Sequence, residues 1–143
     1  MRKISKAKEA RKNSLKKQIS TQKKARKEQK AKLIAVNAKI ERLKKARKDL
    51  KGDVDDLKSF KTSLGTSLKV NKESFSGDRE MKFEKKISDT KSEISSVIKK
   101  HNNNVTRIDD KITSLQETAD GISSSIDAVN FLIDGLSSNM NAL

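Results

Sequence analysis

The chain has 143 residues, of which 32% are hydrophobic and 37% are charged, and its aromatic side chains are four Phe. This composition provides too little apolar material for the core of a thick globular domain. The sequence has no Pro and only five Gly, so long helices are the simplest interpretation. Cysteine is absent, which excludes disulfides and thiolate metal sites.

The net charge of +15 is concentrated in the first third of the chain. Residues 1–50 contain 20 Lys or Arg and four acids, a net +16, whereas residues 51–143 contain 14 and 15, a net −1. No apolar run of a secretory signal follows the basic start, and no stretch approaches the roughly 20 apolar residues of a spanning helix. We therefore expect no transmembrane segment and, for any export, a route without a cleavable signal peptide.

The first predicted helix, at about residues 3–71, carries a thin apolar stripe. From Leu33 to Leu68 the stripe follows the three-four spacing of a heptad. Arg47 and Lys61 interrupt it, although their aliphatic stems can still cover apolar surface. Upstream of Leu33 the stripe is reduced to a few aliphatic residues among lysines, and we expect that end to fray unless a partner covers it.

The best candidate for a turn lies at about residues 72–78. Gly77 can adopt conformations that other residues avoid, Asp78 can cap a following helix, and Phe75 precedes both. A turn here joins two helices of similar length. We therefore predict an all-α fold over residues 1–143, a single long antiparallel two-helix hairpin with coiled-coil-like packing.

The second predicted helix, at about residues 79–142, carries a longer apolar seam. From Ile94 to Leu143 the heptad spacing is kept over seven heptads, and His101 is the one polar member of the series. Such a narrow stripe must be covered by another helix.

The end of this helix is more apolar than its beginning. Residues 121–143 carry two charges, Asp127 and Asp134. Their apolar stripe is wider than one helical partner needs. We predict that this stretch docks a partner through Phe131, Leu132, Ile133 and Leu136, while self-association into a four-helix bundle stays open as the alternative.

The sequence offers no catalytic, cofactor or metal site. Acids such as Asp109 and Asp110 are neighbours on a helix and do not converge on one ion, and no glycine-bearing calcium loop surrounds them. His101 lies on the seam, without the second group and the cleft that general-base chemistry needs. We expect a protein that is not an enzyme.

A short basic repeat raises the question of nucleic-acid binding. The sequence KKARK at residues 23–27 recurs at 44–48, three heptads later, so both copies lie on one helix face. Lys and Arg neutralise phosphates, but no aromatic residues are interleaved for base stacking and no zinc motif is present. The pattern argues against specific recognition and leaves a basic coiled coil that binds nucleic acid or an anionic surface as the alternative function.

The predicted turn resembles that of a known family. The relevant residues are Phe75-Ser76-Gly77-Asp78-Arg79, followed by Lys82-Phe83 and a second long helix. With the length and the lysine-rich first helix, they are similar to the YwqH-like family of WXG-like helical hairpins associated with type VII secretion in Gram-positive bacteria. The resemblance implies a chaperone-like targeting factor that binds the helical targeting domain of an LXG-type toxin, with room for a second small helical protein in the complex. It also implies a cytoplasmic location before export through the type VII system.

Overall fold

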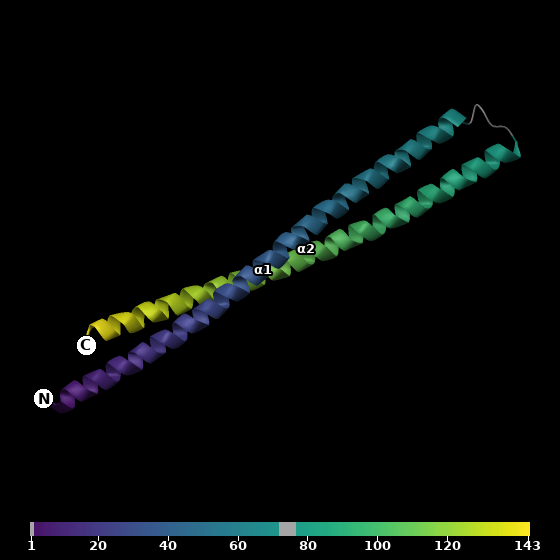
Figure 1. Cartoon of the computed structure of the whole chain (residues 1–143). Helices are drawn as coiled ribbons and strands as arrows, with labels where there is room; N and C mark the ends of the chain where they lie inside the picture. The colour runs from purple at the N-terminus through teal and green to yellow at the C-terminus, as the bar shows by residue number, and fades with distance from the viewer. Residues whose placement is uncertain (1, 72–76) are drawn as a thin grey trace. The chain divides into compact units, whose positions relative to one another are not determined.

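The computed structural model of the chain describes residues 2–71 and 77–143 and consists of two long helices (Figure 1). Helix α1 spans Arg2–Asn71 and helix α2 spans Asp78–Asn141. No strand occurs in these described ranges. The predicted all-α class, with two helices packed against each other, is confirmed, and each helix end lies within one residue of its predicted position.

Helix α2 begins directly after a glycine and has two acids in its first turn. Gly77 has a φ of 72°, in the left-handed region that glycine adopts without strain, and its carbonyl oxygen accepts a hydrogen bond from the Met81 N–H at 3.3 Å. Asp78, expected in the turn, is instead the first residue of α2, where its carboxylate and that of Glu80 favour the positive end of the helix dipole. Phe75, which the sequence also assigns to the turn, lies outside the described residues.

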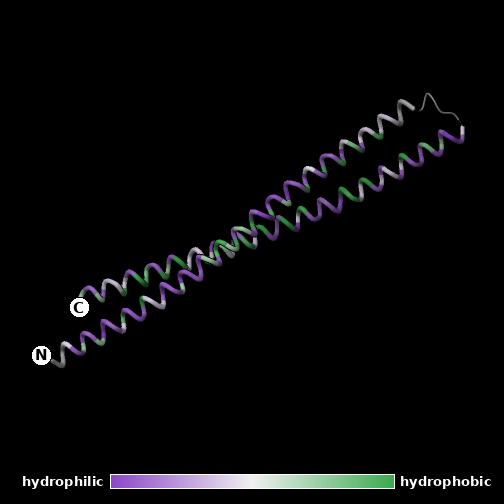
Figure 2. Tube along the Cα trace, viewed as in Figure 1, coloured by the Kyte–Doolittle hydropathy of each residue, from purple (hydrophilic) through white to green (hydrophobic). Residues whose placement is uncertain are grey.

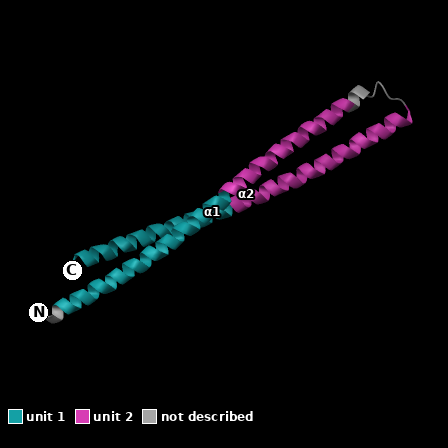
Figure 3. Ribbon diagram, in the orientation of Figure 1, with its two compact units in different colours: residues 1–40, 113–143 teal, residues 41–112 magenta. Residues whose placement is uncertain are grey.

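The chain divides into two compact units, and each contains one segment of each helix (Figure 3). Unit 1 comprises residues 1–40 and 113–143, and unit 2 comprises residues 41–112. Within each unit the α1 and α2 segments lie side by side and run in opposite directions. A single domain over residues 1–143 stays a prediction.

The core of each unit is a single row of aliphatic side chains contributed by both helices. Unit 1 buries Leu15, Ile19, Ile40, Leu115, Ala119, Ile126 and Ile133, and unit 2 buries Val54, Ile87, Ile94, Val105 and Ile112. No polar side chain is buried among the residues that the structure describes. Helix packing in both units therefore depends on apolar contact along one narrow seam.

The apolar stripe of α1 upstream of Leu33 was expected to need a partner protein to cover it, but α2 of the same chain covers part of it. Leu15 and Ile19 are 9% and 8% exposed, because antiparallel pairing places the apolar end of α2 in the same unit. Figure 2 shows this pairing of a largely hydrophilic α1 segment with a more hydrophobic α2 segment. On α2, the predicted seam from Ile94 to Met140 is buried or half-buried throughout, and Leu143 is 37% exposed. This chain thus covers most of its own seam.

Two isoleucines of α1 in unit 1 provide a matched test of the seam. Ile40 is 5% exposed and Ile34 is 71% exposed. We expect Ile40→Ala to lower the free energy of unfolding by about 2–4 kcal/mol, since it removes buried methyl groups and leaves a gap. Ile34→Ala should change it by less than about 0.5 kcal/mol. Chemical denaturation followed by circular dichroism measures both, and equal effects would contradict the observed seam.

Candidate functional site

Three polar pairs join the two helices beside the apolar seam. In each pair a basic residue of α1 donates to a side-chain oxygen of α2. Arg26 Nη1 donates to Asn130 Oδ1 at 2.8 Å in unit 1, and in unit 2 Arg47 Nε donates to Asp109 Oδ1 and Lys61 Nζ donates to Ser95 Oγ at 2.7 Å.

The three pairs share one helical register. Arg26, Arg47 and Lys61 are separated by whole heptads, and their partners on α2 step backward by the same numbers of residues. A polar residue at a seam position favours the alignment in which its partner faces it, because any slip leaves the polar group without a bond. These three basic residues of α1 therefore help to fix how α1 aligns with α2 within each unit.

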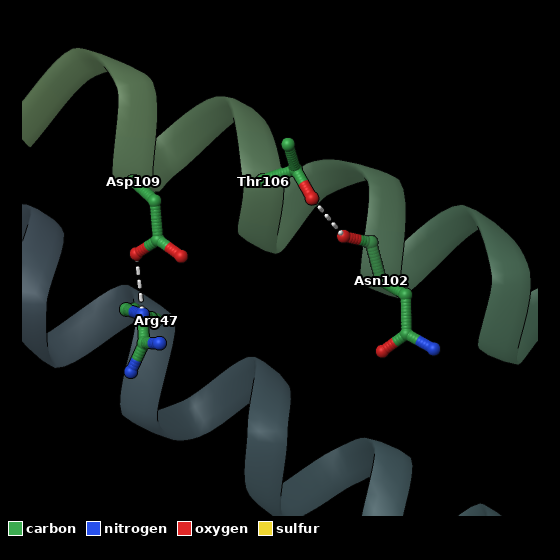
Figure 4. A network of polar contacts seen from close by, with 4 residues as sticks. All are labelled: Arg47, Asn102, Thr106 and Asp109. Atoms are coloured by element: carbon green, nitrogen blue, oxygen red, sulfur yellow. Dashed lines mark hydrogen bonds and ion pairs between the residues drawn. The ribbon is translucent and has the colours of Figure 1, made fainter.

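The Arg47 pair is the charged member of this set (Figure 4). The side chains of Arg47 and Asp109 are 35% and 44% exposed, so water screens their attraction only in part. One turn before Asp109 on α2, Thr106 Oγ1 donates to the carbonyl oxygen of Asn102 at 3.2 Å and so bonds within its own helix. Arg47 and Asp109 thus provide the direct polar link between α1 and α2 at this level.

Sequence reasoning found the basic residues of these pairs but missed their partners. It assigned the stems of Arg47 and Lys61 to covering apolar surface and did not single out Asp109 or Ser95 as acceptors. A signal was present, because each acceptor directly follows a seam residue of α2 and the acceptors repeat with the heptad spacing of the basic residues. They are Ser95 after Ile94, Asp109 after Ile108 and Asn130 after Val129.

Both copies of the KKARK repeat contribute their arginine to this register. Arg26 and Arg47 occupy the same place in the two copies, and each bonds to α2. The lysines of both copies are exposed, and Lys44 pairs with Glu41 of the same helix at 3.7 Å. One face of the repeat therefore belongs to helix packing, and the lysines form the solvent-facing part.

The four residues predicted to dock a partner separate into two groups. Phe131 is 83% exposed and Leu132 is 44% exposed. Ile133 is only 6% exposed and Leu136 is half-buried, because both lie on the seam that α1 covers within unit 1. The exposed apolar surface at this end of α2 thus consists chiefly of Phe131 and Leu132, and partner binding by all four residues stays a prediction.

Within the described residues, no group of three or more His, Cys, Asp or Glu side chains is arranged to hold a metal ion. His101 is half-buried on the seam in unit 2. None of the described helices is long and apolar enough to span a membrane.

The fold and the paired seam define a helical protein with coiled-coil-like packing. The chain belongs to the YwqH-like family, whose family model matches residues 10–138 and so includes most of both helices. Comparisons with curated proteins and with solved structures found no match.

A double-mutant cycle tests the Arg47–Asp109 pair. From Arg47→Ala, Asp109→Ala and the double variant, we expect a coupling free energy of about 0.2–1 kcal/mol, because the pair is partly exposed. The coupling should decrease as salt is raised. The more exposed pair of Glu41 and Lys44, at 3.7 Å, serves as the control and should couple more weakly. Zero coupling for Arg47 and Asp109 at low salt would contradict their role in the register.

Proposed function

We propose that this protein is a non-enzymatic helical partner that binds the helical targeting domain of an LXG-type toxin and promotes its type VII secretion. The observation that carries the proposal is the exposure of Phe131 beside Leu132 on a helix whose buried seam is already covered. An aromatic side chain with 83% of its surface in water gains free energy when a partner covers it. Membership of the YwqH-like family supports the same type of partner.

The charge of unit 1 fits an acidic partner. Residues 1–40 and 113–143 contain 15 Lys or Arg and six Asp or Glu. Both ion pairs that the described residues form lie in unit 2, so none of the described lysine side chains of unit 1 lies within ion-pair distance of a carboxylate. Unpaired surface lysines attract a negatively charged helix over a distance and speed association more than they tighten the complex.

The apolar pair supplies the part of the interface that salt does not weaken. Full burial of a Phe or Leu side chain contributes about 1.5–3 kcal/mol. The best anchors of an interface cost 2 kcal/mol or more, as an order of magnitude, when they are truncated. Phe131 and Leu132 would thus hold the complex, while the lysines of α1 would orient it.

Co-expression with the toxin's helical targeting domain tests this proposal. We expect a heteromer that survives high salt in size-exclusion chromatography with light scattering. The double variant Phe131→Ala and Leu132→Ala should weaken binding about 30-fold, which corresponds to the loss of about 2 kcal/mol. Isothermal titration calorimetry measures the affinity between the two purified proteins. A secretion assay then compares toxin export in the presence of the unchanged protein and of the double variant.

Phe60 provides the matched control, because it is 52% exposed but lies in unit 2. Phe60→Ala should leave the affinity within about twofold of the unchanged protein. If the Phe131 and Leu132 variant bound the targeting domain with full affinity, the proposed docking surface would be wrong. Formation of a stable homodimer with no affinity for the targeting domain would favour the self-associating bundle instead.

The exposed lysines of the KKARK repeat also favour the second candidate function, a basic coiled coil that binds nucleic acid or an anionic surface. In that case, a variant with Gln at Lys23, Lys24, Lys44 and Lys45 should lose binding. Arg26 and Arg47 are left unchanged in this variant, because they bond to α2. Affinity for a duplex oligonucleotide should fall steeply between low and moderate salt, because each neutralised phosphate releases counterions. A fluorescence anisotropy titration at several salt concentrations measures this dependence.

A further inference from the structure

A groove in unit 2 gathers positive charge and hydroxyl groups from both helices. It is a shallow groove, largely open to solvent, with a volume of about 500 Å³. Helix α1 contributes Lys58, Lys61 and Thr62, and helix α2 contributes Lys91, Ser95 and Ile98. We propose that this groove, called the lysine groove below, binds a phosphate oxyanion.

The lysine groove itself contains no acidic side chain to balance these lysines. Among the described residues, neither Lys58, Lys61 nor Lys91 forms an ion pair. Asp55 lines a separate groove that shares Lys58. Three ammonium groups that line one groove repel each other, and an anion between them removes that repulsion.

The donors that face the groove are available to a ligand. Lys61 Nζ uses one N–H in its bond to Ser95 Oγ at 2.7 Å, which leaves two N–H groups. Ser95 acts as the acceptor in that bond, so its own hydroxyl hydrogen can turn toward an anion. Thr62 differs, because its hydroxyl donates to the carbonyl oxygen of Lys58 at 3.1 Å. The ligand is therefore held chiefly by ammonium groups and by the Ser95 hydroxyl.

Gly65 makes room for one of the three ammonium groups. A Cβ atom added at Gly65 would lie 3.0 Å from Lys91 Nζ. Gly52, Gly121 and Gly135, the other helical glycines, have no such neighbour within 4 Å. The absence of a side chain at Gly65 thus lets the Lys91 ammonium lie directly against α1, close to the groove.

A ligand with several oxygens and more than one negative charge suits this arrangement better than a monovalent anion does. Ammonium groups act as point charges toward phosphate, and their hydrogen bonds to a charged oxygen are stronger than bonds between neutral groups. Inorganic pyrophosphate presents six terminal oxygens and fits a groove lined by three lysines. The groove lies in unit 2, whereas Phe131 lies in unit 1, so this inference does not rest on the proposed partner.

Titration of the full chain with pyrophosphate by isothermal titration calorimetry, at fixed ionic strength, tests the inference. We expect saturable binding with one site per chain, which Lys61→Met or Lys91→Met each weaken about tenfold through loss of a charged hydrogen bond. Lys111→Met is the control, because it removes the same charge from an exposed position of α2 in unit 2 that does not line the groove. It should change the affinity by less than about twofold.

Two glycine substitutions distinguish an effect on pyrophosphate binding from an effect on helix stability. Gly65→Ala should displace the Lys91 ammonium and weaken pyrophosphate binding, while the melting temperature is unchanged or higher because Ala favours a helix. Gly52→Ala meets no neighbouring atom and should raise the melting temperature without changing the affinity. Absence of saturable binding, equal binding of chloride, or full affinity in the Lys61 and Lys91 variants would overturn the proposal. In the last case the phosphate would be bound elsewhere on the basic helix.

Discussion

Apolar contact along one narrow seam is the interaction on which the rest of this structure depends. The buried aliphatic residues of each helix lie on one face, and none of the described seam positions holds a fully buried aromatic side chain. Helices in water gain most of their stability from packing an apolar face, so neither long helix is expected to persist alone. Ile40 of α1 and Ile133 of α2, both buried in unit 1, illustrate the dependence, because each is covered only when α1 and α2 pair.

A seam of interchangeable aliphatic residues leaves the alignment of the helices poorly defined, and the polar pairs supply what it lacks. A slip by one heptad would keep Ile or Val opposite other aliphatic residues, but it would move Arg26 away from Asn130 and Arg47 away from Asp109. The pairs are partly exposed, so they add little free energy individually. Their effect is specificity, because the correct register is the one in which all of them form together.

Sequence reasoning predicted the helices well because their signals are local. The absence of Pro, the heptad spacing and Gly77 locate both helices to within a residue at each end. The exposed fraction of a single residue depends on which side chains of the other helix lie opposite it, and a single sequence does not show that. The heptad spacing separates the seam residue Ile133, which is 6% exposed, from Phe131 beside it, which is 83% exposed, but it does not tell that α1 of the same chain covers Ile133. For the same reason Asp109 was not recognised as a partner of Arg47, since the register that joins them follows from pairing two helices.

Anion binding in the lysine groove also affects how α1 and α2 align. Lys61 and Ser95 come from different helices and already bond to each other, so the groove exists only while α1 and α2 are aligned. A ligand that binds only the aligned state stabilises that state in proportion to the logarithm of its concentration relative to its dissociation constant. An oxyanion in the groove therefore favours the same register that Arg47 and Asp109 favour elsewhere in unit 2. Because Lys61 belongs both to a polar pair and to the groove, anion binding and helix alignment are linked through one side chain.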